Sequence, residues 1–227
     1  MFAGWLSRRH FIAAALAGGY ALPSAAAPAS PAPRTILVVG DSLSAEYGLK
    51  RGAGWVALLE KRLAAQKIPA RVVNASISGD TTSGGRSRLP AILAQHKPDV
   101  VVLELGGNDA LRGLPLALTE ENLAHMAETA QKARARVLLV GIQVPPNYGT
   151  DYANRFAGLY RSVARSHKTA LVPFMLKGVA DGADATRLFQ PDRIHPTEAA
   201  QPLILDNIWP ELKKLLPAPA AAGIAGS

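Results

Sequence analysis

The sequence predicts an α/β protein in which a parallel sheet is covered by helices on both faces. Five apolar runs rich in β-branched residues alternate with amphipathic segments of helical period, which is typical of this class. The chain has 227 residues and is 48% hydrophobic and 19% charged, which suits one domain with a full core. A small polar segment follows each apolar run, and ligands collect at the carboxyl ends of parallel strands. The predicted functional site therefore lies at that edge of the sheet.

The strands and helices can be placed in order along the chain. Strands are expected near residues 35–39, 71–75, 99–105, 136–142 and 170–174. Helices are expected between and after the strands, each marked by apolar residues at helical spacing. These residues are Trp55, Leu58, Leu59 and Leu63; Leu89, Ile92 and Leu93; Leu123, Met126, Ala127 and Ala130; Tyr152, Phe156, Leu159, Tyr160 and Val163; and residues 203–216. All these apolar residues are interpreted as core.

Two of the predicted helices carry signals near their starts. Pro90 is expected to start or kink the second helix, because proline disrupts a helix interior but is tolerated in the first turn. Thr119 is expected to cap the third helix, since Glu120 and Glu121 follow it and favour a first turn.

Both ends of the chain are predicted to lie outside the domain. Ser7-Arg8-Arg9-His10-Phe11-Ile12 precedes a short apolar segment, and Ser24-Ala25-Ala26 offers a small-residue cleavage site. This order resembles a twin-arginine export signal, and an ordinary secretory signal is the alternative. The segments are therefore expected to be an export signal at 1–26, a Pro/Ala-rich linker at 27–34, the folded domain at 35–216 and a disordered tail at 217–227. The mature protein is expected to be periplasmic or secreted.

Composition excludes several kinds of site. The chain has no cysteine, which excludes disulfides, thiolate metal sites and a cysteine nucleophile. Its formal charge is +8, but the basic residues are scattered and do not interleave with aromatic side chains, so nucleic-acid binding is not expected. Transient contact with an anionic lipid surface or attraction of anionic substrates is compatible with this charge, and ordinary solvated faces are the alternative interpretation. No metal or other cofactor and no obligate protein partner is expected.

A serine, an aspartate and a histidine form the predicted catalytic group. Ser42 lies in the polar turn Gly40-Asp41-Ser42-Leu43-Ser44, which is expected to end the first strand and open a helix. A serine hydroxyl needs a base to become nucleophilic, and that base needs a group that orients it. His195 is the predicted base because Asp192 precedes it by three residues and Pro196 holds the segment in a loop. Taken alone, Ser42 is equally readable as a helix cap.

The chain offers other candidates for the base and its orienting carboxylate. His96, His125 and His167 fall in or next to helical segments and are interpreted as surface or packing residues. Asp181 and Asp184 lie in a Gly- and Ala-rich stretch that is interpreted as solvated loop.

Three groups at strand ends are candidate donors to an oxyanion. They are the backbone N–H of Ser42, the backbone N–H of Gly79 and the side-chain amide of Asn108. Glycine at position 79 lets the backbone approach a substrate, and Gly106-Gly107 lets the chain turn to aim Asn108 inward. For Gly79 and Asn108 a simple turn or capping role remains the alternative interpretation.

The four ordered segments resemble the blocks of the SGNH (GDSL) hydrolase family. They are Gly40-Asp41-Ser42-Leu43-Ser44, residues 74–82, residues 104–109 and Asp192-x-x-His195-Pro196. Leu111-Arg112-Gly113 and Pro146-Asn147-Tyr148-Gly149 are similar to its bacterial thioesterase/protease/lysophospholipase and arylesterase group. The resemblance covers about residues 35–216, and Arg193 departs from it, since this group often has glycine there.

The resemblance implies a fold, a site and an activity. The implied fold is a flavodoxin-like, three-layer α/β/α domain with a five-stranded parallel sheet. The implied catalytic residues are Ser42, Asp192 and His195, and the implied oxyanion hole is formed by Ser42, Gly79 and Asn108. The expected reaction is hydrolysis of small-molecule carboxylic esters and thioesters, including aryl esters, fatty acyl thioesters and lysophospholipids, through an acyl-enzyme on Ser42.

Loop position predicts the substrate contacts, and two other functions are alternatives. The acyl or aryl group is expected against five residues: Leu111, Leu114, Val144, Pro145 and Tyr148. The first alternative is a carbohydrate O-deacetylase of the same family, which would need a shallow polar pocket. The second is a flavodoxin-like protein that binds an anion without catalysis. An α/β-hydrolase is not expected because the Gly-x-Ser-x-Gly elbow is missing.

Overall fold

The computed structural model describes residues 33–182 and 185–216. The predicted export signal (1–26), most of the predicted linker (27–32) and the predicted tail (217–227) lie outside the described residues, as does Asp184. Within this part of the chain, no helix is long and apolar enough to cross a membrane.

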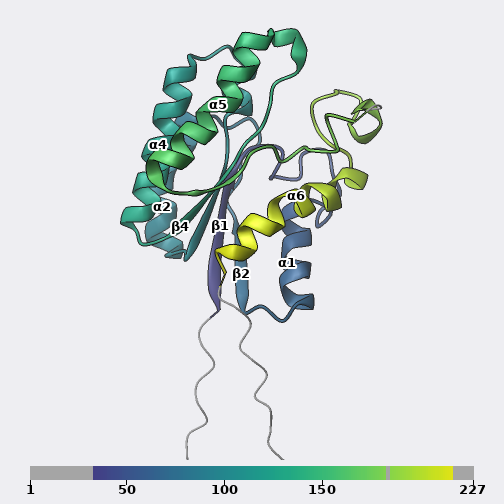
Figure 1. Cartoon of the computed structure of the whole chain (residues 1–227). Helices are drawn as coiled ribbons and strands as arrows, with labels where there is room; N and C mark the ends of the chain where they lie inside the picture. Colours follow the sequence, from purple (N-terminus) through teal and green to yellow (C-terminus); the bar gives the residue numbers. More distant parts are fainter. Residues whose placement is uncertain (1–32, 183–184, 217–227) are drawn as a thin grey trace, which may run out of the picture. The chain divides into compact units, whose positions relative to one another are not determined.

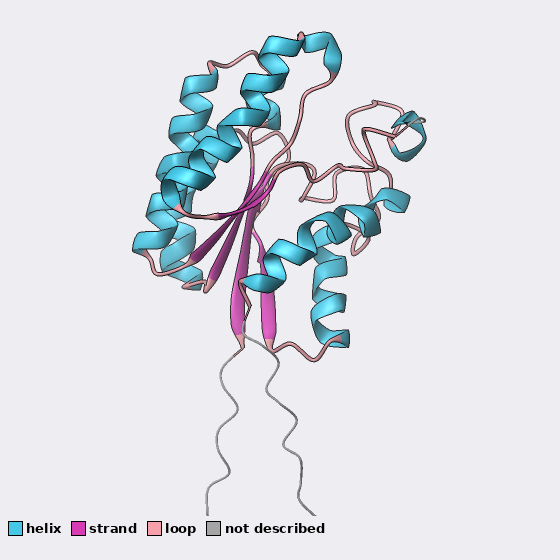
Figure 2. Cartoon of the chain, viewed as in Figure 1, coloured by secondary structure: helices cyan, strands magenta, loops and turns pink. Residues whose placement is uncertain are grey.

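The sheet has five parallel strands, as the sequence predicted (Figures 1 and 2). The strands are β1 (Arg34–Gly40), β2 (Ala70–Asn74), β3 (Val100–Glu104), β4 (Arg136–Val140) and β5 (Ala170–Val172). Their order is β2-β1-β3-β4-β5, which is the flavodoxin-like order. The direction of the chain across the sheet reverses between β1 and β3, and ligands in such sheets bind at this switch point.

Helices cover both faces of the sheet (Figure 1). One face packs against α1 (Trp55–Ala65) and α6 (Gln201–Lys214), and the other packs against α2 (Thr82–His96), α4 (Leu116–Lys132) and α5 (Thr150–His167). Shorter helical segments are α3 (Gly107–Leu111), η1 (Pro146–Tyr148), η2 (Ala185–Leu188) and η3 (Glu198–Ala200). The flavodoxin-like three-layer fold is therefore confirmed.

The alternating side chains of β1 explain why the sheet needs two layers of helices. Ile36 and Val38 belong to the core cluster under α1 and α6, whereas Leu37 and Val39 belong to the cluster under α2, α4 and α5. All four are fully buried. A continuous apolar run is what a strand buried on both faces requires.

One predicted helix start is wrong, that of Thr119, whereas Pro90 lies inside α2, one of its two expected positions. α2 begins at Thr82, where the Thr81 side chain accepts a hydrogen bond from the Gly84 N–H, so Pro90 lies inside the helix rather than at its start. α4 begins at Leu116 after Pro115, so Thr119 is not its cap. Thr119 is fully buried in the helix, and its hydroxyl donates to Asp109 Oδ1 at 3.3 Å. A threonine suits this position because the buried Asp109 carboxylate needs hydrogen-bond donors, not because the helix needs a cap.

Candidate active site

The turn that carries Ser42 follows β1 at the switch point of the sheet. The Asp41 carbonyl accepts from the N–H groups of Ser44 and Ala45 at 3.2 and 3.0 Å. The helix that the sequence predicted here does not form, and the next helix begins only at Trp55. Glu46 and Gly48 have φ values of 59° and 71°, and such left-handed residues cannot continue a right-handed helix.

The structure brings Ser42, His195 and Asp192 into one hydrogen-bonded chain. Ser42 Oγ lies 2.8 Å from His195 Nε2, and His195 Nδ1 lies 2.6 Å from Asp192 Oδ2. The other oxygen of Asp192 accepts from the N–H groups of Ile194 and His195 at 2.9 and 3.0 Å. The carboxylate therefore fixes both the loop and the imidazole ring, which leaves Nε2 facing the serine.

These hydrogen bonds also set the charge of Asp192. Partial burial raises the pKa of its carboxyl, but the hydrogen bonds from the His195 ring, the His195 N–H and the Ile194 N–H outweigh burial and lower the pKa to about 2. Asp192 is thus ionised at neutral pH and able to stabilise a protonated imidazole beside it.

The competing residues lie elsewhere. His96 and His167 are the last residues of α2 and α5, and His125 lies within α4. Asp181 accepts a hydrogen bond from the Gly178 N–H in its own loop.

Tyr47 packs against the histidine and was missed by sequence analysis. Its ring centroid lies 4.3 Å from that of His195, with the ring planes inclined by 38°. Gln190 Nε2 donates to the carbonyl oxygens of Tyr47 and Pro196, at 2.9 and 3.1 Å. These contacts join the serine turn (residues 41–48) to the histidine loop (residues 190–196). An aromatic residue five positions after the serine was the signal available in the sequence.

The three predicted oxyanion donors differ in how they are engaged. In the described part of the chain, neither the Ser42 N–H nor the Gly79 N–H donates a hydrogen bond. Gly79 has a φ of 79°, and its carbonyl accepts from Arg112 Nη2 at 2.7 Å. Asn108 Nδ2 donates to Asp41 Oδ2 at 3.1 Å and to the Asp80 carbonyl at 2.8 Å. The two backbone donors are thus available, whereas the Asn108 amide is held by acceptors on both sides.

Two buried carboxyl groups lie next to the serine turn and were not predicted as site residues. Burial raises the pKa of Asp41 to about 6, although the Leu43 N–H donates to this carboxyl and lowers its pKa. Burial also raises the pKa of Glu104 well above its usual value. Ser44 Oγ donates to Glu104 Oε2 at 2.6 Å and accepts from Trp55 Nε1 at 3.2 Å. This network links the turn that carries Ser42 to β3 and α1.

A second polar cluster fixes the short helix that carries Asn108. Asp109 is buried and accepts hydrogen bonds from the Thr82 N–H at 2.9 Å, from the Thr82 hydroxyl and from the Thr119 hydroxyl. The turn into α3 depends on Gly106, whose φ is 120° and where an added Cβ would clash with the Tyr160 hydroxyl. The predicted sharp turn before Asn108 is therefore present.

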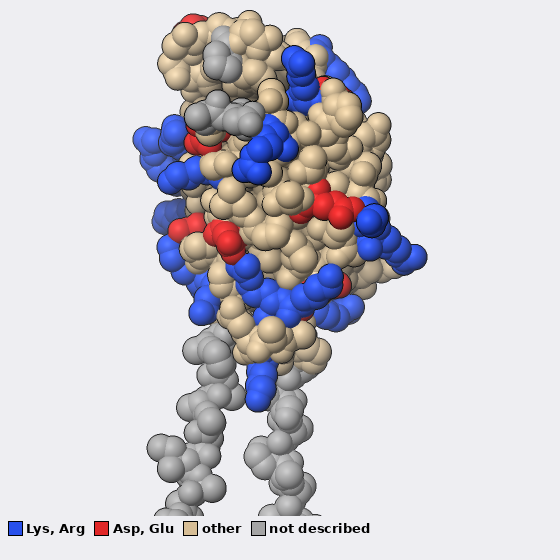
Figure 3. All heavy atoms as spheres, turned by 90° about the vertical axis from the view of Figure 1, so that its right-hand side faces the viewer, with Lys and Arg blue, Asp and Glu red and all other residues tan. Residues whose placement is uncertain are grey.

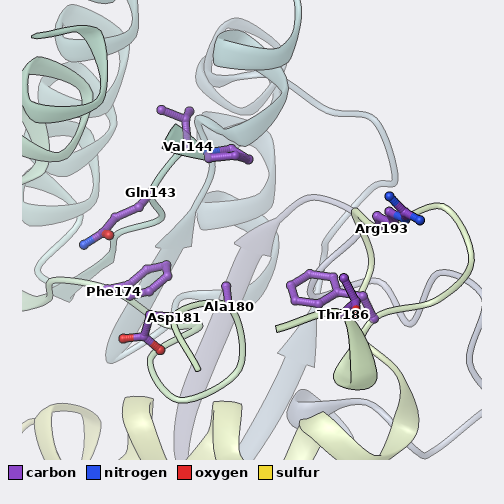
Figure 4. A pocket seen from close by; sticks show the side chains of 9 residues that line it. Gln143, Val144, Phe174, Ala180, Asp181, Thr186 and Arg193 are labelled. Atoms are coloured by element: carbon purple, nitrogen blue, oxygen red, sulfur yellow. The ribbon is translucent and has the colours of Figure 1, made fainter. Parts of the chain in front are cut away.

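A cavity of about 440 Å³ lies beside the histidine loop (Figure 4). Its lining residues come from the loops after β4 and β5 and from residues 186–193: Gln143, Val144, Pro145, Phe174, Ala180, Asp181, Thr186, Phe189 and Arg193. Val144 and Pro145 were predicted as substrate contacts. The other predicted contacts, Leu111, Leu114 and Tyr148, are not among the residues that line this cavity. Tyr148 instead stacks on Tyr152, with ring centroids 6.0 Å apart.

Sequence analysis missed the two phenylalanines of the cavity. Phe174 lies two residues beyond β5, so its place after a strand was a usable signal. Phe189 lies in the irregular segment before the histidine, and no periodic pattern marks it. Among the described residues, no group of three or more His, Asp or Glu side chains is arranged to hold a metal ion.

Known proteins with this sequence pattern are hydrolases. Residues 38–202 match the model of the GDSL-like lipase/acylhydrolase family. The chain is 57% identical over 185 residues to the esterase TesA of Pseudomonas aeruginosa, covering 82% of this chain and 90% of the relative. It is 41% identical over 182 residues to thioesterase 1/protease 1/lysophospholipase L1 of Escherichia coli K12, covering 80% of this chain and 85% of the relative. The crystal structure of TesA matches with a TM-score of 0.78 at 57% identity, covering 81% of this chain and 100% of that one.

Proposed function

The chain belongs to the GDSL-like lipase/acylhydrolase family, and from this membership and the site geometry we propose that it hydrolyses carboxylic esters and thioesters through an acyl-enzyme on Ser42. The enzyme is a serine hydrolase acting on ester bonds. The observation that carries the proposed mechanism is the hydrogen-bonded chain from Ser42 Oγ to His195 Nε2 and from His195 Nδ1 to Asp192 Oδ2, at 2.8 and 2.6 Å.

The first half of the reaction makes the acyl-enzyme. Ser42 Oγ attacks the carbonyl carbon while His195 Nε2 takes its proton, and Asp192 stabilises the imidazolium that forms. The N–H groups of Ser42 and Gly79 donate to the oxyanion, and Asn108 adds a third donor when one of its amide hydrogens turns to the substrate. As the intermediate collapses, His195 gives its proton to the leaving alcohol or thiol.

The second half releases the acid. Water attacks the acyl-enzyme as His195 removes its proton, and Ser42 leaves with that proton. A thiolate leaves readily and needs little help from an acid, whereas an amine needs a strong acid step. We therefore expect esters and thioesters, including aryl esters, fatty acyl thioesters and lysophospholipids, to be hydrolysed faster than peptides.

The nucleophile is tested with a serine-directed phosphonate that carries a mass tag. We expect one equivalent to label the peptide that contains Ser42, with matching loss of p-nitrophenyl ester hydrolysis. Ser42→Ala should abolish both labelling and hydrolysis. Ser83→Ala is the matched control because Ser83 is an exposed serine of α2, and it should retain both. Labelling of another residue, or hydrolysis by Ser42→Ala, would remove Ser42 from the mechanism.

The alternative within the family is a carbohydrate O-deacetylase. The cavity beside the histidine loop disfavours it, because Val144, Phe174 and Phe189 give this cavity an apolar wall that suits a longer or aromatic group. Comparing rates over a p-nitrophenyl ester chain-length series with rates on acetylated xylan separates the two. Faster release of acetate from xylan than of any aryl ester would favour the deacetylase.

The surroundings of the site support a transient contact with lipid. Four large apolar side chains in the segments that follow β1, β2, β3 and β5 are 47–53% exposed: Tyr47, Ile77, Leu111 and Ile194. Lys and Arg outnumber Asp and Glu on the face that carries α1 and α6, and they are spread over it rather than gathered (Figure 3). Co-sedimentation with anionic vesicles tests the contact, and neutral vesicles are the control.

Export through the predicted signal at residues 1–26 belongs to the same proposal, and an uncleaved cytoplasmic protein would contradict it.

A further inference from the structure

Arg193 is one of the few described non-glycine residues with a left-handed backbone. Of the described non-glycine residues, six have a left-handed backbone, and four of these lie where a helix ends, at Lys67, Lys97, Arg134 and Lys168. Such a conformation is usual after the last turn of a helix. Glu46 is the fifth, and its carboxylate accepts from the N–H groups of Gly52 and Gly54. Arg193, with a φ of 59°, lies in the turn that Asp192 fixes, and its N–H donates to the Gln190 carbonyl at 2.9 Å.

The Arg193 side chain lines the cavity without a partner. In the described part of the chain, its guanidinium forms no ion pair and donates no hydrogen bond. It lies on the opposite side of the cavity from Gln143, Phe174 and Asp181 (Figure 4). It directly follows Asp192 and precedes His195 by two residues, so this side of the cavity is formed by the loop that carries the histidine.

The chemistry of this arrangement favours an anion at one end of the substrate. A guanidinium binds carboxylate or phosphate with two parallel hydrogen bonds. Arg193 is exposed, so its attraction for an anion acts partly through water and weakens with salt. Asp181, on the far side, disfavours an anion there.

We propose that Arg193 is a specificity-determining residue that favours esters bearing a carboxylate or phosphate a few bonds from the scissile carbonyl over matched neutral esters. This inference rests on the proposed esterase function. The anionic group can belong to the acyl part or to the leaving alcohol, and the two are distinguished by separate substrate pairs.

The test compares kcat/KM within matched pairs. For the acyl side the pair is p-nitrophenyl hydrogen adipate and p-nitrophenyl methyl adipate. For the alcohol side it is 1-lauroyl lysophosphatidic acid and 1-monolauroylglycerol. In Arg193→Gln, we expect the anionic-to-neutral ratio of at least one pair to fall about 10-fold, the size of one charge-assisted hydrogen bond. Arg193→Lys should keep part of the preference, Arg193→Glu should reverse it, and high salt should weaken it in the wild type.

Two further variants separate this role from folding and from overall charge. Arg193→Gly removes the cation while suiting the left-handed backbone, so it should fold and show the same loss of preference. Arg187→Gln removes an exposed arginine of η2 that does not line the cavity, and it should keep the wild-type ratio. Unchanged ratios for both pairs in Arg193→Gln and Arg193→Gly would overturn the proposal. Wild-type protein that hydrolyses none of the four esters would instead overturn the esterase function.

Discussion

At the scale of single residues, Asn108 is held by its neighbours before any substrate binds. Its amide nitrogen Nδ2 donates one hydrogen bond to Asp41 Oδ2, at 3.1 Å, and another to the Asp80 carbonyl oxygen, at 2.8 Å. An acceptor on each side restricts rotation of the amide, so a substrate oxyanion competes with Asp41 for a donor that already lies in place. Preorganised donors of this kind stabilise the transition state more than the ground state.

Removing the Asn108 amide should slow the chemical step. We expect Asn108→Ala to lower kcat about 10²- to 10³-fold with little change in KM, because the donor acts mainly on charge that develops in the transition state. Steady-state kinetics with an aryl ester measures this split. Asn154→Ala, which changes an exposed asparagine of α5, should behave as the wild type. Wild-type kcat in Asn108→Ala would exclude the amide from the mechanism.

The raised pKa of Asp41 predicts a pH-dependent stability. Its carboxyl has a pKa of about 6 in the folded protein against an ordinary value of 3.8. The folded state therefore binds this proton more tightly than the unfolded state. The stability that the proton contributes is fully present below pH 4 and is lost as pH rises through about 6.

Asp41→Asn should remove this dependence, because the amide does not titrate. We expect the free energy of unfolding of the wild type to fall relative to that of the variant by about 2–3 kcal/mol between pH 4 and pH 7. Urea unfolding at several pH values measures the difference. The lost acceptor for Asn108 lowers the stability of the variant equally at each pH, so only the slope matters. Parallel curves would show that Asp41 has an ordinary pKa.

At the scale of elements, the turn between β3 and α3 is constrained by both backbone angle and space. Gly106 has a φ of 120°, and the Tyr160 hydroxyl, which donates to the Leu105 carbonyl at 2.9 Å, occupies the position that a side chain would need. This tyrosine comes from α5, so the far helix layer determines how α3 leaves the sheet. Asn108 owes its position to that contact.

Gly106→Ala should therefore destabilise the fold. We expect a loss of about 2–4 kcal/mol in the free energy of unfolding, from the backbone angle together with the clash at Tyr160. The control is Gly158→Ala, because Gly158 lies within α5 and an added Cβ would meet nothing within 4 Å. The control should gain about 0.5–1 kcal/mol from helix propensity. Equal stabilities for the two variants in urea unfolding would refute this account of the turn.

At the scale of the whole molecule, the strands and the edge of the sheet that carries the site could be predicted from periodicity and chain order. The β-branched runs marked all five strands, and the polar segments after them marked the edge where Ser42 meets His195. The contact of Tyr47 with His195 and the bond from Ser44 to Glu104 depend on side chains brought together only by packing. No spacing in the sequence carries that information, which is also why Thr119 was misread as a cap.

The nucleophile and its base are 153 positions apart in the chain. During synthesis the serine leaves the ribosome early, whereas the imidazole follows only after all five strands have been made. A nascent or half-folded chain therefore cannot cleave a bond. The time at which hydrolysis first appears during refolding should therefore report when the loop that carries His195 docks onto Ser42.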